Sequence, residues 1–332
     1  MKILQVGLGS MGKRRIRNLK SLGLEDIVGF DFREDRRQEA QEKYSVKVVD
    51  KIDDSILSDI DIFIISTPPD RHLEYMWMAV NHHKPAFVEA SVIKEGLAEL
   101  AEAAQKNKVL IAPSCTLRFH PSIRVIKELV SSRTYGKVCN FIYHMGQYLP
   151  DWHPWEDIRD FYVSEKNTGA GREMVPFELT WMVEVFGFPR EVFAFCGKTM
   201  DLGVDIDDTY SINLKFDNYF GNVLVDVVAR YANRNLIVNL ERGSIFWNWN
   251  EKIVKLYDAN LSRWIYYHEP QGKAHEGYNP NIIEEMYIEE MNAFIRAFKG
   301  EDKFPNSLKE DARILEILEV LEKTNHGTTI MH

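Results

Sequence analysis

The sequence predicts an α/β protein of two domains: a doubly wound parallel sheet first, then an α+β domain with a large, mostly antiparallel sheet. Apolar strands alternate with helical segments over residues 2–114, which indicates parallel strands joined by crossover helices. Beyond residue 121 the apolar period changes to two, with short turns between runs, which indicates antiparallel strands. The length of 332 residues also exceeds one typical hydrophobic core.

In the first domain, the best strand is predicted at residues 60–67 (IDIFIIST). It is nearly all apolar, which suits a parallel strand buried on both faces. The other strands are expected at 2–6, 25–32, 46–50, 85–89 and 109–114, with helices after the glycines of 7–12 and at 33–44, 70–83 and 93–107.

In the second domain, residues 209–217 (TYSINLKFD) alternate apolar and polar side chains, as a strand with one buried face does. A helix is predicted at 121–132, further strands at 222–231, 235–241, 244–250, 252–258 and 263–269, and closing helices at 282–300 and 305–323. The last helix opens with a capping box, Ser307 to Glu310. We therefore expect domains at 1–120 and 121–304, and a C-terminal helix within 305–325.

The composition narrows the class of function. Lys and Arg number 41 against 50 Asp and Glu, a net charge of −9, which argues against nucleic-acid binding. The sequence contains no run of about 18 apolar residues, so no membrane span is expected. Three widely separated cysteines predict a reducing, cytoplasmic location. His and Cys residues nowhere have metal-ligand spacing, so we expect no metal site.

The pattern Gly7-x-Gly9-x-x-Gly12 lies between the first strand and the first helix, and an acidic residue, Asp31, ends the second strand. This context predicts a Rossmann dinucleotide site, with the pyrophosphate at the helix N-terminus and the adenosine ribose on Asp31. A carboxylate there repels a 2′-phosphate and favours NAD over NADP, although Arg33, Arg36 and Arg37 weaken that preference.

With VGLGSMGKRRIRNL, ISTPPDRHLEY, FVEA and TLRFHPSI in this order, nearly the whole chain resembles the Gfo/Idh/MocA family, the relatives of glucose–fructose oxidoreductase and inositol dehydrogenase. The resemblance implies a carbohydrate substrate, a homo-oligomer (dimer or tetramer), and a last helix that packs back on the nucleotide-binding domain. It also implies that the cofactor is contacted by Gly7, Leu8, Gly9, Ser10, Met11, Gly12, Asp31, Thr67, Pro68, His72, Glu89 and Arg118.

The acid/base residues that the family usually carries are replaced. Where the family reads Glu-Lys-Pro this chain reads Glu89-Ala90-Ser91, and the usual His and Asp positions align with Phe177 and Thr180. Neither Ala nor Phe can move a proton, and proton transfer contributes roughly 10²–10⁴ in rate. The replacement candidates are Glu178, His120, Glu173, Tyr148, His153 and Lys94.

The segment 146–162 (GQYLPDWHPWEDIRDFY) is rich in aromatic residues beside polar ones. Its aromatic side chains, Tyr148, Trp152, Trp155 and Tyr162, could stack on sugar rings while His153, Asp157 and Arg159 bond hydroxyls. The alternative is that these aromatic residues pack at a domain junction. Both interpretations remain open at this stage.

Three functions are consistent with the sequence. The first is an NAD-dependent oxidoreductase acting on a sugar, amino sugar or nucleotide-linked sugar with a non-standard acid/base set. The second is an epimerase, lyase or hydrolase type of enzyme that uses tightly bound NAD for transient oxidation. The third is a nicotinamide-binding protein without redox turnover.

Overall fold

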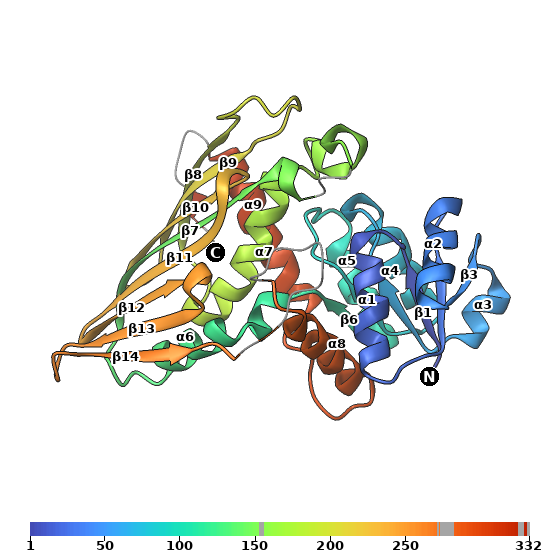
Figure 1. Cartoon of the computed structure of the whole chain (residues 1–332), viewed down its shortest axis with the longest axis horizontal. Coiled ribbons are helices and arrows are strands. Elements are labelled where there is room, and N and C mark those ends of the chain that lie inside the picture. The colour runs from blue at the N-terminus through green and yellow to red at the C-terminus, as the bar shows by residue number, and fades with distance from the viewer. Residues whose placement is uncertain (153–155, 271, 273–281, 325–328, 331–332) are drawn as a thin grey trace. The chain divides into compact units, whose positions relative to one another are not determined.

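The computed structural model describes residues 1–152, 156–270, 272, 282–324 and 329–330. It divides into two compact units (Figure 1). The first comprises Met1–Thr116 and Ile283–Arg313; the second comprises Leu117–Ile282 and Ile314–His332.

The first unit contains a six-stranded, wholly parallel sheet in the order β3-β2-β1-β4-β5-β6. This order reverses beside β1, the arrangement of a Rossmann fold, and confirms the predicted doubly wound sheet. The strands are β1 (Ile3–Val6), β2 (Ile27–Phe30), β3 (Lys47–Val49), β4 (Ile62–Ile65), β5 (Ala86–Val88) and β6 (Ile111–Pro113). The helices are α1 (Ser10–Ser21), α2 (Glu34–Tyr44), α3 (Asp54–Asp59), α4 (His72–Asn81), α5 (Leu97–Asn107) and α8 (Glu284–Phe298).

The second unit contains a nine-stranded sheet in the order β14-β13-β12-β11-β7-β10-β9-β8-β15. Among these neighbours β10 and β7 run parallel and the rest antiparallel, so the predicted, mostly antiparallel sheet is confirmed. The strands are β7 (Val138–Tyr148), β8 (Glu191–Gly197), β9 (Thr209–Lys215), β10 (Phe220–Asp226), β11 (Val228–Leu240), β12 (Gly243–Asn248), β13 (Ile253–Asp258), β14 (Arg263–His268) and β15 (Thr329–Ile330).

One face of this second sheet is covered by helices α6 (Pro121–Ser131) and α7 (Ala170–Phe186) (Figure 1). Side chains alternate between the two faces because successive residues of a strand point to opposite sides. On β7, Phe141 and Tyr143 are buried under the helices, whereas Ile142 is 54% exposed on the other face. We call that other face the outward face.

Several predicted boundaries were wrong. The predicted strand 222–231 is divided at Val227, where β10 ends and the 13-residue β11 begins. The Asp226 carboxylate causes this break, because it accepts hydrogen bonds from the backbone N–H groups of Val228 and Ala229. Strands β7 and β8 were not predicted as strands.

The predicted domain limits also differ from the compact units. The first boundary falls at Thr116/Leu117, and helix α8, which the prediction placed in the second domain, belongs to the first unit. The last helix, α9 (Leu308–Lys323), is divided between the units at Arg313/Ile314. Its predicted capping box does form at one end, since Glu310 N–H donates to Ser307 Oγ at 3.2 Å. That this helix packs back on the nucleotide-binding domain stays a prediction.

Candidate functional site

The glycine loop connects β1 to α1 and can be built only from glycine at two of its three positions. Gly7 has φ +87°, and a Cβ there would lie 2.4 Å from the carbonyl oxygen of Ser66. A Cβ on Gly12 would lie 1.9 Å from the carbonyl oxygen of Gly7. These two glycines therefore close the turn and let the helix approach the strand.

Gly9 has a different role, because a Cβ there would meet only the Arg36 guanidinium, 3.4 Å away at its nearest atom. It is the N-cap of α1, and the first helical bond runs from Lys13 N–H to Gly9 C=O at 3.0 Å. The amide groups of the first turn cannot bond within the helix and favour an anion at that end. Because Gly9 has no side chain, the N-terminus of α1 has room for the pyrophosphate of a dinucleotide.

Asp31 follows β2 and is only 3% exposed. One carboxylate oxygen accepts the Leu8 N–H at 2.8 Å, and the other accepts the Arg33 N–H at 2.9 Å. Arg36 Nη1 lies 3.8 Å from the first oxygen. Since a carboxylate oxygen can accept two hydrogen bonds, Asp31 both fixes the glycine loop and keeps acceptor capacity for ribose hydroxyls.

Thr67, Pro68 and His72 follow β4 at the same carboxyl edge of the sheet. His72 is 2% exposed; its Nε2 lies 2.9 Å from the Thr67 carbonyl oxygen and its Nδ1 3.5 Å from Ser91 Oγ. Burial lowers the pKa of His72 to about 4, although the Thr67 carbonyl and the Glu89 charge oppose that change. The ring is therefore neutral near pH 7, with Nε2–H donating to Thr67.

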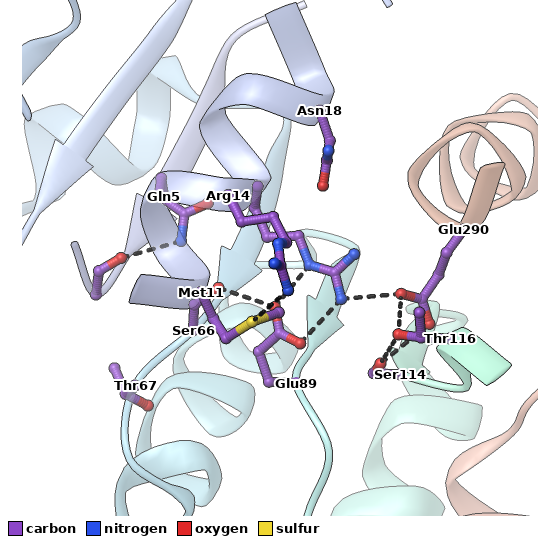
Figure 2. A network of polar contacts seen from close by, with 12 residues as sticks. Gln5, Met11, Arg14, Asn18, Ser66, Thr67, Glu89, Ser114, Thr116 and Glu290 are labelled. Carbon is purple, nitrogen blue, oxygen red and sulfur yellow. Dashed lines mark hydrogen bonds and ion pairs between the residues drawn. The ribbon is translucent and has the colours of Figure 1, made fainter. Parts of the chain in front are cut away.

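Glu89 follows β5, and its carboxylate binds Arg15 of α1 at 2.7 and 2.9 Å and the Ser66 hydroxyl at 3.2 Å (Figure 2). Arg15 is fully buried and also pairs with Glu290 of α8 at 2.9 Å. Burial alone lowers the pKa of Arg15, but the two carboxylates outweigh it and raise that pKa.

Glu290 in turn accepts hydrogen bonds from the Ser114 and Thr116 hydroxyls at 3.0 and 2.8 Å (Figure 2). It also accepts the Cys115 N–H at 2.6 Å. The sequence analysis did not predict this chain of charged groups. The available signal was the spacing of Glu284, Tyr287 and Glu290, which places a polar stripe on one face of α8.

Ala90 and Ser91 occupy the turn after β5, where the sequence analysis expects a replaced lysine. The helix predicted from residue 93 begins only at Leu97, because Gly96 takes the left-handed conformation at φ +77°. Lys94 consequently lies in the turn between β5 and α5, and not on a helix as predicted. Gly7–Gly12, Asp31, Thr67, His72 and Glu89 thus gather at the carboxyl ends of β1, β2, β4 and β5.

Helix α7 carries Phe177 and Thr180, the two other positions at which the sequence analysis expects a replaced acid/base residue. Phe177 is half-buried, and Thr180 is 6% exposed with its hydroxyl donating to the Pro176 carbonyl at 2.7 Å. Glu173 precedes Phe177 by four residues and Thr180 by seven, so these three residues share one face of the helix. The Glu173 carboxylate is half-buried and accepts the Tyr162 hydroxyl at 3.2 Å.

Glu178, another acid/base candidate on α7, faces elsewhere and is fully buried. It accepts four hydrogen bonds, two from Arg234 and one each from Tyr143 and Trp181, at 2.7–3.0 Å. A carboxylate has about four lone-pair sites, so Glu178 has none left for a substrate proton. Its geometry is that of a structural anchor between α7 and the sheet.

Arg118 and His120 precede α6 in the second unit and are both buried. Arg118 Nε donates to the Thr180 carbonyl of α7 at 3.0 Å. His120 is 1% exposed, 3.9 Å from Glu269 and beside Trp247. Burial, with help from Arg234, lowers the pKa of His120 to about 3, so it is neutral and a weak base.

Tyr148 ends β7 and is half-exposed, with the Arg230 guanidinium 3.9 Å from its ring centroid. In the aromatic segment, Tyr162 reaches Glu173, whereas Asp157 and Arg159 are exposed and pair with each other. His153 and Trp155 lie outside the described residues. Of that segment, only Tyr162 is thus joined to an acid/base candidate by a described hydrogen bond.

Neither a cluster of metal ligands nor a membrane-spanning helix occurs among the described residues. Across residues 1–152, 156–270, 272, 282–324 and 329–330, three or more His, Cys, Asp or Glu side chains nowhere gather as metal ligands. Within the same ranges no helix combines the length and apolarity that crossing a membrane requires.

Two family models match the chain: "Oxidoreductase family, NAD-binding Rossmann fold" over residues 1–114, and "GFO/IDH/MocA C-terminal domain" over residues 123–246. An uncharacterized oxidoreductase of Streptococcus pneumoniae serotype 4 is 26% identical over 223 residues, 64% of this chain. The match spans 59% of the length of that relative.

Solved structures match nearly the full length of this chain at low sequence identity. Levoglucosan dehydrogenase in complex with NADH has a TM-score of 0.85 at 17% identity, over 100% of this chain and 99% of that one. A Desulfitobacterium hafniense structure, named as an NADPH-dependent oxidoreductase, has a TM-score of 0.83 at 14% identity, over 99% and 97%. At these identities the likeness establishes the fold, and the two family matches establish the lineage. The chain belongs to the Gfo/Idh/MocA family of oxidoreductases.

Proposed function

We propose that this protein is an NAD-dependent dehydrogenase or reductase acting on a sugar, amino sugar or nucleotide-linked sugar, with an acid/base set unlike that of its family. One observation carries the proposal: the glycine loop is complete, and Gly9 has no side chain above the helix N-terminus. From the family resemblance we also propose that Ala90, Phe177 and Thr180 stand in place of the usual proton-transfer groups. The likeness to levoglucosan dehydrogenase supports a carbohydrate substrate.

The residues of the glycine loop, Gly7 to Gly12, would hold the pyrophosphate, and Asp31 the adenosine ribose. Thr67, Pro68, His72 and Glu89 would follow along the cofactor, with Arg118 toward the nicotinamide. When bound, NAD supplies an acceptor or donor of hydride. This chain's own residues must then orient the substrate carbon and move the hydroxyl proton.

For the choice of cofactor we propose NAD over NADP. The buried Asp31 carboxylate repels a 2′-phosphate. Arg36 opposes this preference from 3.8 Å, whereas Arg33 is paired with Asp35 at 2.7 Å. The preference therefore depends on the balance between Asp31 and Arg36.

For proton transfer we propose Glu173. It lies one helical turn before the lost histidine position on the same face of α7, and it is half-buried and held by Tyr162. Glu178 is excluded by its four protein hydrogen bonds, and His120 by its burial. Tyr148 is the second candidate, because it is half-exposed and the Arg230 guanidinium lies 3.9 Å from its ring centroid.

The test is to follow the absorbance of reduced nicotinamide while the purified protein is mixed with NAD and a panel of sugars, amino sugars and nucleotide-linked sugars. Turnover with at least one supports the proposal. Cofactor that stays bound through gel filtration, with no net reduction, would point to transient oxidation instead. Binding of NAD with no chemistry would indicate a protein without redox turnover.

Two variants then examine the acid/base assignment. Glu173→Gln should lower kcat about 10²–10⁴-fold with little change in NAD affinity, whereas Tyr162→Phe should lower it less. A Glu173→Gln enzyme with unchanged kcat would remove Glu173 from the mechanism. The triple change Ala90→Lys, Phe177→His and Thr180→Asp asks whether the remaining pocket still accepts common family substrates.

We also propose a cytoplasmic homo-oligomer, a dimer or tetramer, joined through the outward face. Neighbouring strands β7, β11 and β12 bring Ile142, Ile237 and Phe246 into one row, and the first two are 54% and 37% exposed. Light scattering should show dissociation for Ile237→Asp and none for Lys51→Asp, a change at an exposed residue of the first unit. A monomeric native chain would rule the assembly out.

A further inference from the structure

Helix α8 joins the first unit from a distant part of the sequence, and two of its carboxylates pair with arginines of α1, the helix that follows the glycine loop. Glu284 lies 3.4 Å from Arg14 Nε and 3.7 Å from Arg17 Nη2. Glu290 Oε2 lies 2.9 Å from Arg15 Nη2. Helix α8 therefore helps to fix the guanidinium groups of α1.

Arg15 is the centre of this network and is fully buried. Its Nε donates to Glu89 Oε1 at 2.7 Å, and its Nη2 donates to Glu89 Oε2 at 2.9 Å (Figure 2). The same Nη2 meets Glu290 Oε2, and because this nitrogen carries two hydrogens it can bond both carboxylates at once. One guanidinium therefore links a residue of α8 to the residue that follows β5.

Glu290 is also held from its other side and has no exposed surface. Its Oε1 accepts the Ser114 hydroxyl at 3.0 Å and the Cys115 N–H at 2.6 Å, and its Oε2 accepts the Thr116 hydroxyl at 2.8 Å. Together with Arg15, these donors use the roughly four lone-pair sites of a carboxylate. Glu290 therefore cannot bind a ligand itself, and its effect on one passes through its partners.

Glu89 differs from Glu290, because it keeps one acceptor site. Its Oε1 accepts Arg15 Nε and the Ser66 hydroxyl, which fills the two lone pairs of that oxygen. Its Oε2 accepts one hydrogen bond among the described residues, from Arg15 Nη2. The Glu89 side chain is 13% exposed, whereas those of Arg15 and Glu290 are completely buried. A ligand can therefore reach the network at Glu89 Oε2, and the bidentate pair with Arg15 fixes the plane of that carboxylate.

The third charge of the network determines what Glu89 attracts. Arg15 alone would neutralise Glu89, but it is shared with Glu290, so one positive and two negative side chains leave a net charge of −1. A carboxylate whose counter-ion is shared remains a strong acceptor for hydroxyl groups and repels phosphates. The free site thus suits a hydroxyl of a neutral sugar ring, such as a ribose.

The order of the strands identifies which ribose of the dinucleotide this is. Asp31 follows β2 on one side of β1, and Glu89 follows β5 on the other side. With the adenosine ribose on Asp31 and the pyrophosphate at the N-terminus of α1, the nicotinamide half of NAD extends over β4 and β5. We propose that Glu290 is a positioning residue for that half: through Arg15 it fixes Glu89 Oε2 as the acceptor of a hydroxyl of the nicotinamide ribose. This role rests on the proposed NAD site.

The experiment compares two ligands of the full chain by fluorescence titration: NADH, and ADP as its competitor. ADP has the adenosine ribose and the diphosphate but lacks the nicotinamide ribose. Glu290→Gln keeps the size of the side chain and removes its charge, so we expect the Kd of NADH to rise about tenfold and that of ADP to change less than about twofold. Because Glu290 acts through Glu89, the double variant with Glu89→Gln should bind NADH no more weakly than the Glu89→Gln single variant.

Two further variants separate this role from a general loss of stability. Thr116→Val removes one donor to Glu290 but leaves every charge in place, and should raise the Kd of NADH about threefold with that of ADP unchanged. It decides the question if Glu290→Gln does not fold. Glu178→Gln is the matched control, since it also removes a buried carboxylate paired with an arginine, but in the second unit. It should lower the free energy of unfolding and leave both dissociation constants unchanged.

Selective weakening of NADH binding in Glu290→Gln and Thr116→Val supports the role, whether or not the protein oxidises any sugar. Equal weakening of NADH and ADP would show that the network only stabilises the unit, and an unchanged affinity for NADH would show that Glu89 does not depend on Glu290; both results overturn the role. A native chain that binds ADP but not NADH overturns it as well. A native chain that binds neither ligand overturns the proposed cofactor site, and this role with it.

Discussion

Arg234 of β11 and Glu178 of α7 form a buried ion pair in which the guanidinium donates twice to one carboxylate oxygen, at 2.9 and 2.7 Å. Tyr143 and Trp181 satisfy the other oxygen at 2.7 and 3.0 Å. This arrangement joins the helix that carries Glu173, Phe177 and Thr180 to the centre of the sheet. Its role is to fix that helix, and not to move protons.

Replacing Glu178 with Gln should therefore lower the free energy of unfolding by about 3–5 kcal/mol, because the Arg234 charge stays buried without its counter-ion. Urea unfolding of the full chain measures this loss. Glu184→Gln is the control on the same helix, since its pair with Lys127 lies near the surface and should contribute under about 1 kcal/mol. Equal losses in the two variants would contradict the assignment.

Substitution by alanine should mainly lower stability at Gly12 and mainly lower NADH affinity at Gly9. At Gly12 a methyl group collides with the Gly7 carbonyl, so we expect a loss of about 1–3 kcal/mol in unfolding free energy. At Gly9 the methyl group meets only Arg36, so the stability should change by less than about 1 kcal/mol while NADH binding weakens about tenfold or more. Urea unfolding and NADH fluorescence measure the two effects. A Gly9→Ala protein that binds NADH normally would place the pyrophosphate elsewhere.

Asp31→Asn should shift the cofactor preference toward NADP. The amide keeps a hydrogen-bond acceptor for the Leu8 N–H but removes the charge that repels a 2′-phosphate, and Arg36 is 3.8 Å away to receive it. We expect the ratio of the NADPH to the NADH dissociation constant to fall by about tenfold, which corresponds to 1.4 kcal/mol. Adding Arg36→Ala should reverse the gain. An unchanged ratio would mean that Asp31 does not face the ribose.

His72 should make the protein sensitive to acid. Its pKa is about 4 in the folded chain and about 6.5 when unfolded, so the unfolded state binds the proton first as the pH falls. The contribution is fully present above about pH 6.5 and is lost toward pH 4, up to about 3 kcal/mol at 1.36 kcal/mol per pH unit.

Urea unfolding between pH 5 and pH 8 measures the effect of His72. His72→Gln keeps a donor for Thr67 but cannot titrate, so its stability should depend less on pH than that of the native chain. His82→Gln, at the exposed end of the same helix, should keep the native dependence. Parallel curves for His72→Gln and the native chain would contradict the assignment.

The features that the sequence predicted depend on residues close together in the chain. The features that it did not predict depend on residues far apart in the chain. Gly7 and Gly12 belong to a short, continuous pattern, and the structure shows at both positions the close backbone approach that only glycine permits. Glu178 looked like a candidate base because nothing near it in the chain reveals Tyr143 or Arg234, which reach it from distant strands.

The break at Val227 shows a different limit. Residues 222–231 read as one strand because no glycine or proline interrupts them. The turn instead depends on the Asp226 side chain, whose carboxylate accepts hydrogen bonds from the amide groups of Val228 and Ala229. The same carboxylate lies 2.7 Å from His144 Nε2, so one polar residue both ends a strand and orients a neighbouring side chain.

The pairing of Arg15 with both Glu89 and Glu290 has a consequence for biosynthesis. The first unit is discontinuous in sequence, since α8 is made only after all of residues 117–282. Until α8 leaves the ribosome, the buried positions of Arg14 and Arg15 lack Glu284 and Glu290 as partners. A nascent chain can therefore align β1 to β6 early but completes its nucleotide-binding unit only near the end of translation, and a fragment cut at residue 120 would lack these counter-charges permanently.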